Sequence, residues 1–238
     1  MIFAIVRNTD YYADNLAGER LRRCYEIAGP RIQRYLDAEI GFVLERISSQ
    51  MSVLELGCGY GRVLCRLLAR TPHVAGIDTA IESLRLARES IPGPRRPRLA
   101  AMDAANTGFR DCAFDLTICI QNGICAFGAD QTRLMAESVR VTRPGGRVLF
   151  SSYSPRFWNH RLEWFEAQAA HRLLGEIDHD ATGDGVIVCR DGFRAATMTA
   201  DRFRALAGEL SLVPQISEVD GSSVFCEIPV TDQEHRKS

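Results

Sequence analysis

Between Met51 and Ser152, short apolar runs alternate with segments of helical periodicity, and this alternation restricts the fold more than any other feature of the chain. The runs carry few polar side chains, as strands buried on both faces do. Parallel neighbouring strands need a crossover, which is usually a helix. The pattern therefore predicts an α/β fold with a doubly wound, mostly parallel sheet covered by helices on both faces. The expected strands are 51–56, 74–78, 98–102, 114–120 and 147–152, and the expected helices between them are 62–70, 79–90 and 131–141.

The flanking segments are less regular. Apolar positions at helical spacing predict a helical N-terminal extension within residues 1–50, with a first helix from Tyr11 that breaks at Gly29-Pro30. An aromatic helix is expected over 155–174, and Asp191-Gly192 predicts a β-hairpin. We expect a single domain, 1–238, made of the extension 1–50, the motif-bearing core 51–152, a cover 153–197, and a helix (201–210) with two strands (213–219 and 223–228) in 198–230.

Composition narrows the function classes. The chain is 46% hydrophobic and 25% charged, as globular proteins are. With a formal net charge of -1 it has no surplus of cations for a phosphate backbone, so nucleic acid is not expected as the main ligand. Its single lysine is Lys237, which argues against Schiff-base and P-loop chemistry that uses an interior lysine.

Targeting and metal signals are weak. The apolar opening Met1–Val6 is too short for the core of a signal peptide, and no run approaches the ~18 apolar residues of a spanning helix. The eight cysteines are scattered, without a CxxC pair or a Cys/His cluster at zinc spacing. We therefore expect free thiols in a cytoplasmic protein, with no metal site and no membrane contact.

The segment Val53-Leu-Glu-Leu-Gly-Cys-Gly-Tyr-Gly-Arg62 carries the main chemical signal. Its glycines stand between a buried strand and a helix, where a tight turn needs positive φ and where missing side chains let a ligand lie against the backbone. The helix that follows offers unpaired N–H groups. A dinucleotide fingerprint would need glycine or alanine at position 62, where Arg62 stands, which weakens the alternative of an NAD-dependent dehydrogenase.

This turn, preceded by Glu55, resembles motif I of the class I S-adenosylmethionine-dependent methyltransferases. Three further features fall where that family's next motifs stand: Asp78 at the end of the second strand, Met102-Asp103-Ala104 after the third, and Arg143-Pro-Gly-Gly-Arg-Val-Leu-Phe150 at the fifth. Together the four features cover residues 51–152 in the family's order. The resemblance implies a seven-stranded Rossmann-like sheet of order 3-2-1-4-5-7-6, with strand 7 antiparallel and a lid inserted after strand 5.

The resemblance also implies S-adenosyl-L-methionine as cofactor and assigns residues to its parts. The methionine part would be lined by the motif I turn, the ribose would bind at the end of the second strand, the adenine would lie after the third, and the fourth strand would end beneath the sulfonium. Tyr12 is similar to an aromatic residue that many small-molecule members place over the cofactor, although packing of its helix on the sheet is an equal alternative. In the same order along the cofactor, the residues are Glu55, Gly57, Cys58, Gly59, Gly61, Asp78, Thr79, Met102, Asp103, Ala104, Ile120 and Gln121.

The segment after the fourth strand should face the methyl acceptor. Gln121-Asn122-Gly123-Ile124 lacks the Asn/Asp-Pro-Pro-Tyr/Phe motif of the amino-group methyltransferases, so a small-molecule acceptor is expected rather than an amide or a base nitrogen. Asn122, Trp158 and Trp164 are the expected acceptor contacts, and His160, Tyr153 and Asn122 are the candidate catalytic groups. The alternatives are that the aromatic helix packs on the core and that the histidine lies on the surface.

Transfer from a sulfonium needs alignment and exclusion of water more than it needs a base, so the sequence leaves the acceptor open. Cys119 and Cys125 flank the acceptor segment and suggest a thiol or metalloid methyltransferase as one alternative. A non-catalytic regulatory protein that binds S-adenosyl ligands is another. Residues 1–35 and 153–197 are predicted to form a mobile cover over the carboxyl ends of the strands.

Overall fold

The computed structural model describes residues 11–12, 15–91 and 93–232, and the statements below refer to these residues. The apolar opening Met1–Val6 and most of the polar C-terminal segment lie outside them. Within the described ranges, no helix is both long enough and apolar enough to cross a membrane.

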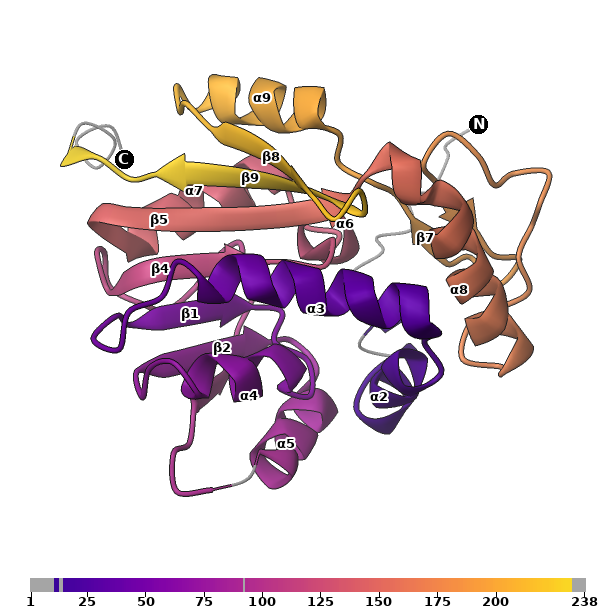
Figure 1. Cartoon of the computed structure of the whole chain (residues 1–238), viewed down its shortest axis with the longest axis horizontal. Coiled ribbons are helices and arrows are strands. Elements are labelled where there is room, and N and C mark those ends of the chain that lie inside the picture. The colour runs from indigo at the N-terminus through magenta and orange to yellow at the C-terminus, as the bar shows by residue number, and fades with distance from the viewer. Residues whose placement is uncertain (1–10, 13–14, 92, 233–238) are drawn as a thin grey trace.

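A seven-stranded sheet forms the centre of the described structure, in the order β3-β2-β1-β4-β5-β9-β8 (Figure 1). The first five strands are parallel, and β9 runs antiparallel to both of its neighbours. The predicted order is confirmed, because β8 and β9 take the places of strands 6 and 7. The strands are β1 (Val53–Leu56), β2 (Val74–Asp78), β3 (Arg98–Ala101), β4 (Phe114–Cys119), β5 (Thr142–Tyr153), β8 (Gln215–Val219) and β9 (Ser223–Pro229).

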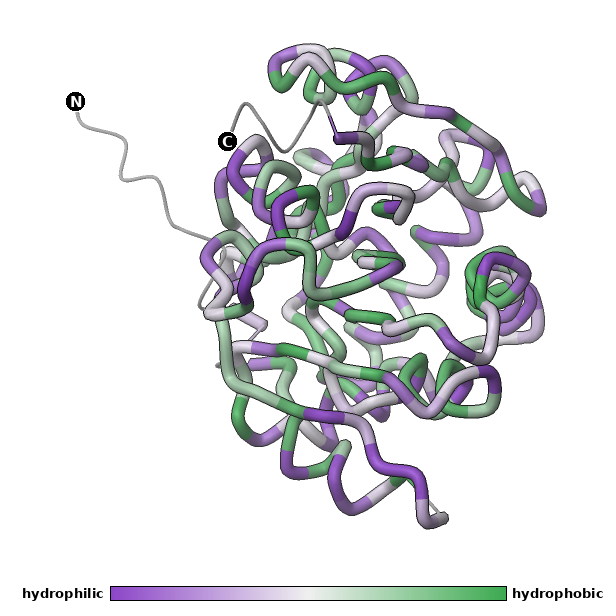
Figure 2. Tube along the Cα trace, turned by 90° about the vertical axis from the view of Figure 1, so that its left-hand side faces the viewer, coloured by the Kyte–Doolittle hydropathy of each residue, from purple (hydrophilic) through white to green (hydrophobic). Residues whose placement is uncertain are grey.

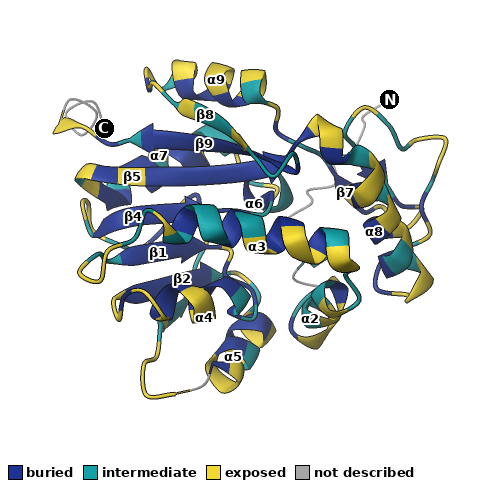
Figure 3. Ribbon diagram, in the orientation of Figure 1, coloured by how far each residue is buried: buried dark blue, intermediate teal, exposed yellow. Residues whose placement is uncertain are grey.

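Helices cover both faces of the sheet and turn their buried sides toward it (Figure 3). One face packs against α3 (Pro30–Leu44), α4 (Arg62–Leu68) and α5 (Ile81–Ser90), and the other against α7 (Gln131–Val141) and α9 (Ala200–Glu209). A hydrophobic cluster lies on each face of the sheet. Val53 of β1 packs in the cluster on the side of α3 and α4, and Leu54 packs in the cluster on the side of α7 and α9, because strand side chains alternate between the two faces. The hydropathy along the helices changes from residue to residue, as in helices that bury one side (Figure 2).

A third hydrophobic cluster lies beyond the carboxyl ends of the strands. It joins α2 (Glu19–Glu26) to the first half of α3, to α8 (Trp158–Ala170) and to the small hairpin of β6 (Ile187–Val188) and β7 (Arg194–Ala195). Figure 1 shows these elements on the right, where the parallel strands end. We call this group of elements the cover.

Several boundaries differ from the sequence prediction. Tyr11, Tyr12 and Asn15 are helical as expected, but Gly18, with φ 56°, interrupts the helix before α2 begins at Glu19. Strand β5 begins at Thr142 rather than at Arg147, because Thr142 pairs with Phe114 before a register shift. The hairpin strands are two residues each, shorter than expected, although Asp191-Gly192 does connect them.

Candidate functional site

The motif I turn and the ends of β2, β4 and β5 meet at one edge of the sheet, because the carboxyl ends of parallel strands point the same way. In open α/β sheets this edge is where ligands bind. The cover lies directly beyond it (Figure 1). The candidate site therefore consists of this edge and the cover residues that contact it.

The motif I turn has the conformation that the sequence predicted. Gly57, Gly59 and Gly61 have φ values of 70°, 53° and 84°, in the left-handed region that favours glycine. A Cβ atom on Gly57 would lie 2.3 Å from the ring of Phe127, and one on Gly59 would lie 2.9 Å from Cδ2 of Leu21 in α2. The turn needs glycine both for its backbone conformation and for the close approach of its neighbours.

Asp78 connects the end of β2 to this turn. Its Oδ2 accepts a hydrogen bond from the Gly59 N–H at 2.8 Å, and its Oδ1 accepts one from the Ala80 N–H at 2.8 Å. Burial raises the pKa of the Asp78 carboxyl, and the backbone N–H groups oppose that shift. Thr79, the next residue, is exposed. The acid assigned to the ribose thus lies beside the turn assigned to the methionine part.

The three residues assigned to the adenine follow β3 at the same edge. The Met102 N–H donates to the Asp78 carbonyl oxygen at 3.2 Å, and Ala104 is buried. Asp103 is exposed, and its Oδ1 accepts a hydrogen bond from the Ala105 N–H at 2.8 Å. The structure therefore brings this segment next to Asp78, with the Asp103 carboxylate bonded within its own turn.

Two non-glycine residues with left-handed backbone follow strand β4, Gln121 at φ 57° and Asn122 at φ 66°. Such conformations persist where the surroundings hold them, and they are concentrated at functional sites. The Asn122 side chain accepts from Ser152 Oγ at 2.6 Å and donates to the Ala196 carbonyl oxygen at 2.9 Å. Asn122 therefore joins β5 to the hairpin of the cover.

Glu55 supplies a buried carboxylate directly before the motif I turn. It is 5% exposed, and its Oε2 has no hydrogen-bond partner among the described residues. Burial raises the pKa of Glu55 well above its ordinary value, and the nearby Arg62 guanidinium opposes this. Nη2 of Arg62 donates to Gln121 Oε1, and Cζ of Arg62 lies 4.5 Å from the ring centre of Tyr25. Nε2 of Gln121 also has no partner in the described structure.

Glu39 of α3 is a site residue that the sequence analysis missed. It is fully buried, and its Oε2 accepts from the Gln121 N–H at 2.9 Å. Burial raises the pKa of the Glu39 carboxyl from 4.5 to about 7, because the hydrogen bonds it receives offset the loss of hydration only in part. One signal was available: Glu39 interrupts the apolar stripe of its helix next to Ile40.

Glu39 predicts a pH dependence of stability. Its folded-state pKa of about 7 lies above the ordinary 4.5, so its contribution to the unfolding free energy is complete below pH 4.5 and is lost as the pH rises to about 7. The unfolding free energy of the unsubstituted protein should fall by roughly 2–3 kcal/mol between pH 5 and pH 7 because of Glu39, at about 1.4 kcal/mol per pK unit. Glu39→Gln should lack this part of the decrease. Urea unfolding at both pH values measures it. Glu45→Gln, on the exposed end of the same helix, is the control, and an unchanged slope in Glu39→Gln would contradict the assignment.

Of the remaining predicted residues, some are buried and others are exposed. Tyr153 is buried at the end of β5, next to Ser152, which donates to Asn122. His160 is exposed on α8, where its Nδ1 lies 3.5 Å from Oε2 of Glu163. Trp164 is buried and donates from its indole N–H to the Cys24 carbonyl oxygen of α2 at 3.0 Å, and Trp158 is half-buried.

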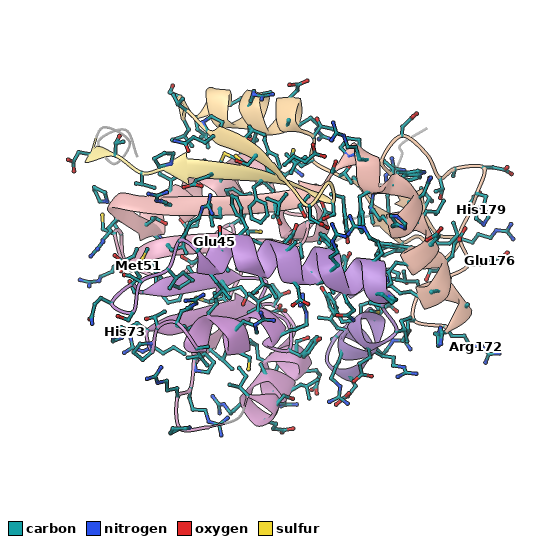
Figure 4. All side chains as sticks on the ribbon, in the orientation of Figure 1. Glu45, Met51, His73, Arg172, Glu176 and His179 are labelled. Carbon is teal, nitrogen blue, oxygen red and sulfur yellow. The ribbon has the colours of Figure 1, made fainter. Side chains whose placement is uncertain are left out.

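Tyr12, which the resemblance places over the cofactor, lies in the cover, whereas the histidine His179 lies outside it. The ring of Tyr12 packs against Phe193 of the cover, with centroids 5.8 Å apart. His179 lies at the outer right side of the molecule, with Arg172 and Glu176 (Figure 4). Its Nε2 is 3.9 Å from Oε1 of Glu166, in an exposed pair. The structure thus keeps Tyr12 among the cover contacts and places His179 apart from the strand edge.

A family model described as a methyltransferase domain matches residues 53–146, which include the motif I turn, Asp78 and Asn122. Residues 53–146 thus carry the methyltransferase domain, in agreement with the resemblance of their motifs to the class I S-adenosylmethionine-dependent methyltransferases. A solved structure of an S-adenosylmethionine-dependent methyltransferase from Thermotoga maritima superposes on this chain with a TM-score of 0.63 and 14% identity, covering 93% of this chain and 99% of that one. At that identity the likeness concerns the fold.

Sequence relatives agree with this family. A phthiotriol/phenolphthiotriol dimycocerosates methyltransferase of Mycobacterium ulcerans is 35% identical over 130 residues, which are 52% of this chain and 45% of the relative. A malonyl-(acyl-carrier protein) O-methyltransferase of Halorhodospira halophila is 30% identical over 138 residues, 57% and 46% of the two chains. The chain therefore spans about half the length of these curated relatives.

The side chains at this edge fit the cofactor of the family, S-adenosyl-L-methionine. The cofactor carries an ammonium group, a sulfonium and two ribose hydroxyls, all of which interact favourably with carboxylates. The site edge offers the Glu55 carboxylate, which has an unpartnered oxygen, and the Asp78 carboxylate beside it. The motif I turn supplies a backbone surface on which any Cβ would collide with a neighbour.

Proposed function

We propose that this chain transfers the methyl group of S-adenosyl-L-methionine to a small-molecule acceptor at the edge between the strand ends and the cover. The observation that carries the proposal is the glycine turn hydrogen-bonded to Asp78 next to the buried, partly unpartnered carboxylate of Glu55. When bound, the cofactor supplies a methyl group on a sulfonium, which is an activated leaving group.

The residues of the edge bind and orient the cofactor. The backbone of the motif I turn lies against the methionine part, and Glu55 accepts hydrogen bonds there. Asp78 accepts from the ribose hydroxyls, since hydrogen bonds to a charged acceptor are the strong ones. The remaining contacts are those assigned from the family motifs: Tyr12, Cys58, Thr79, Met102, Asp103, Ala104, Ile120 and Gln121.

Acceptor alignment falls to Asn122, Tyr153 and the cover. An in-line displacement gains most from holding the reacting atoms roughly 3–3.5 Å apart and from excluding water. A base is needed only for an alcohol or an ammonium acceptor. Glu39 can hold such a proton at its carboxylate, because its pKa of about 7 lies near neutral pH. His160 is a weaker candidate, since it is exposed and paired with Glu163.

The cover acts as a lid in this proposal. Trp164 and Tyr25 pack α8 against α2, with ring centroids 5.8 Å apart, so the two helices share one hydrophobic cluster separate from those of the sheet. Closure of such a unit shields the sulfonium from water. The division of the single domain into 1–50, 51–152, 153–197 and 198–230 is part of the same proposal.

The lid predicts a protease footprint. Limited proteolysis should cut within 153–185 in the free protein, and S-adenosylhomocysteine should slow the cut several-fold. Trp158→Ala, at a half-buried position, should lower the rate of methyl transfer about tenfold with little change in cofactor affinity, because it disturbs alignment alone. Equal cleavage rates with and without the ligand would make the cover a static part of the core.

Two alternatives predict other results. A thiol or metalloid methyltransferase that used Cys119 and Cys125 would need thiolates, yet burial raises the pKa of Cys125 to about 11 and that of Cys119 well above its ordinary value, so both are protonated near neutral pH. A regulatory protein would bind S-adenosyl ligands without turnover. A cytoplasmic location and the lack of a nucleic-acid ligand stay predictions of the sequence.

Calorimetry with S-adenosylmethionine, S-adenosylhomocysteine and NAD tests the proposal. Both sulfur nucleotides should bind and NAD should not. A screen of metabolite pools with labelled S-adenosylmethionine then separates an enzyme from a regulatory protein. Binding of NAD without a response to either sulfur nucleotide would sink the proposal.

A further inference from the structure

Arg161 of α8 is the largest fully buried side chain of the described structure, with an exposed fraction of 0%. Nη1 donates to the Gly185 carbonyl oxygen at 2.9 Å, and Nη2 donates to the Ala195 carbonyl oxygen at 2.9 Å. Nε has no partner among the described residues. A guanidinium offers five N–H donors, so its bonding capacity exceeds what these two carbonyls use.

The charge of Arg161 lacks a carboxylate partner in the described part of the chain. Burial lowers the pKa of Arg161, and the titratable groups near it are the hydroxyls of Tyr153, Tyr12 and Tyr35 and the thiol of Cys125. These acids are neutral near pH 7, because burial raises the pKa of each of them. Arginines on the surface of the same region differ, since Arg156 pairs with Glu218 and Arg190 with Glu176.

Aromatic rings surround the guanidinium. Its Cζ lies 4.6 Å from the ring centre of Tyr153, 5.4 Å from that of Phe165 and 5.8 Å from that of Trp158. Such rings stabilise a cation in part, but a buried charge without a counter-ion stays unfavourable. Two carbonyl bonds explain how α8 holds the hairpin, and they leave a fully charged side chain at this position unexplained.

Arg161 also lies next to the acceptor segment. It bonds the Ala195 carbonyl oxygen, and Asn122 bonds the carbonyl oxygen of Ala196, the following residue. Tyr153, whose ring faces the guanidinium, ends β5 beside Ser152, which bonds Asn122. The cation therefore stands at the acceptor side of the site.

We propose that Arg161 binds a carboxylate group of the methyl acceptor, and that the acceptor is a carboxylic acid with an apolar or aromatic body. The planar fork of a guanidinium matches a carboxylate in a bidentate geometry, and the rings of Tyr153, Trp158 and Phe165 supply the apolar wall. This inference rests on the proposed function, because that function defines the acceptor side.

Binding of simple acids tests the inference directly. The protein is saturated with S-adenosylhomocysteine, and ligand-observed NMR titrations compare benzoate, cinnamate and hexanoate with benzamide, cinnamamide and hexanamide. Each pair shares its body and differs in the charge of its head group. We expect at least one carboxylate to bind about tenfold or more tighter than its amide, because the amide leaves the cation without a partner.

Variants then assign the preference to this side chain. Arg161→Met should remove the preference for carboxylates without changing the affinity for the amides, and Arg161→Lys should keep part of it, since the charge stays while the fork is lost. Arg156→Met, at an exposed arginine just before α8, is the matched control and should keep the full preference. Circular dichroism and S-adenosylhomocysteine affinity verify the fold of each variant.

The outcomes separate the two proposals. If S-adenosylhomocysteine does not bind, the proposed function fails. If it binds but no carboxylate binds tighter than its amide, or if Arg161→Met keeps the preference, Arg161 only tethers the hairpin and the inference is overturned while the proposed function stands. Should the Arg161 variants fail to fold, the carboxylate–amide comparison in the unsubstituted protein decides.

Discussion

Gly57→Ala is expected to lower the unfolding free energy by roughly 2–5 kcal/mol and to abolish measurable cofactor binding. The left-handed backbone at φ 70° costs a non-glycine residue about 1–2 kcal/mol. The new methyl group would also lie 2.3 Å from the Phe127 ring, and overpacking of this kind costs about 1–3 kcal/mol. A displaced turn would also lose the contact of the Gly59 N–H with Asp78, and with it the cofactor contacts proposed for both. Denaturant unfolding and calorimetry with S-adenosylhomocysteine measure the two effects.

Gly221→Ala separates strain from crowding. Gly221 has a similar φ of 61°, and a Cβ there would meet nothing within 4 Å. This control should lose only the strain term, about 1–2 kcal/mol, and should bind S-adenosylhomocysteine as the unsubstituted protein does. If Gly57→Ala loses no more stability and no more affinity than Gly221→Ala, the role assigned to the turn is wrong.

Asp78→Ala is expected to weaken S-adenosylhomocysteine binding by about 10- to 150-fold, which corresponds to the 1.5–3 kcal/mol of hydrogen bonds to a charged group. The ribose hydroxyls lose their acceptor. The Gly59 N–H also loses its 2.8 Å bond, so the turn itself becomes less fixed. Calorimetry measures the affinity. Asp78→Asn keeps one acceptor oxygen, so its affinity should lie between that of Asp78→Ala and that of the unsubstituted protein.

Asp201→Ala serves as the matched control, because Asp201 is an exposed carboxylate paired with Arg204 in α9. Its loss should change stability by no more than about 0.5 kcal/mol and should leave the affinity unaltered. A folded Asp78→Ala protein with unchanged affinity would remove the ribose assignment and leave Asp78 as a support of the glycine turn.

Local signals accounted for most element positions. The helix Gln131–Val141 has its predicted bounds because its start is encoded next to it: the Asp130 carboxylate accepts from the N–H groups of Thr132 and Arg133. Thr199 caps α9 in the same way, through the Arg202 N–H. Where the local signal was apolar spacing alone, as between Tyr11 and Glu19, the predicted continuous helix is interrupted at Gly18.

The acceptor side depended on distant contacts. Glu39 and Arg161 each lie in a helix whose pattern predicts amphipathic packing, and both are fully buried. The place of Glu39 in the apolar stripe of its helix is a local signal of burial, but it does not show which groups the carboxylate meets. Their environments are built by segments far along the chain, from Gln121 in one case and from Gly185 and Ala195 in the other. Trp164 was expected to contact the acceptor. The structure shows that its indole N–H donates to the Cys24 carbonyl oxygen of α2, a contact that the sequence did not predict.

The sequence by itself determined the α/β class, the glycine turn and the family motifs of this chain, because strand burial, turn conformation and helix caps depend on residues that are neighbours in the chain. Only the tertiary structure decided which charges the cover encloses and that His160 and His179 lie exposed, away from the strand edge. Burial and pairing of a side chain depend on segments that lie 74 and 140 residues away in the cases of Asn122 and Trp164, and a pattern within one segment does not contain them.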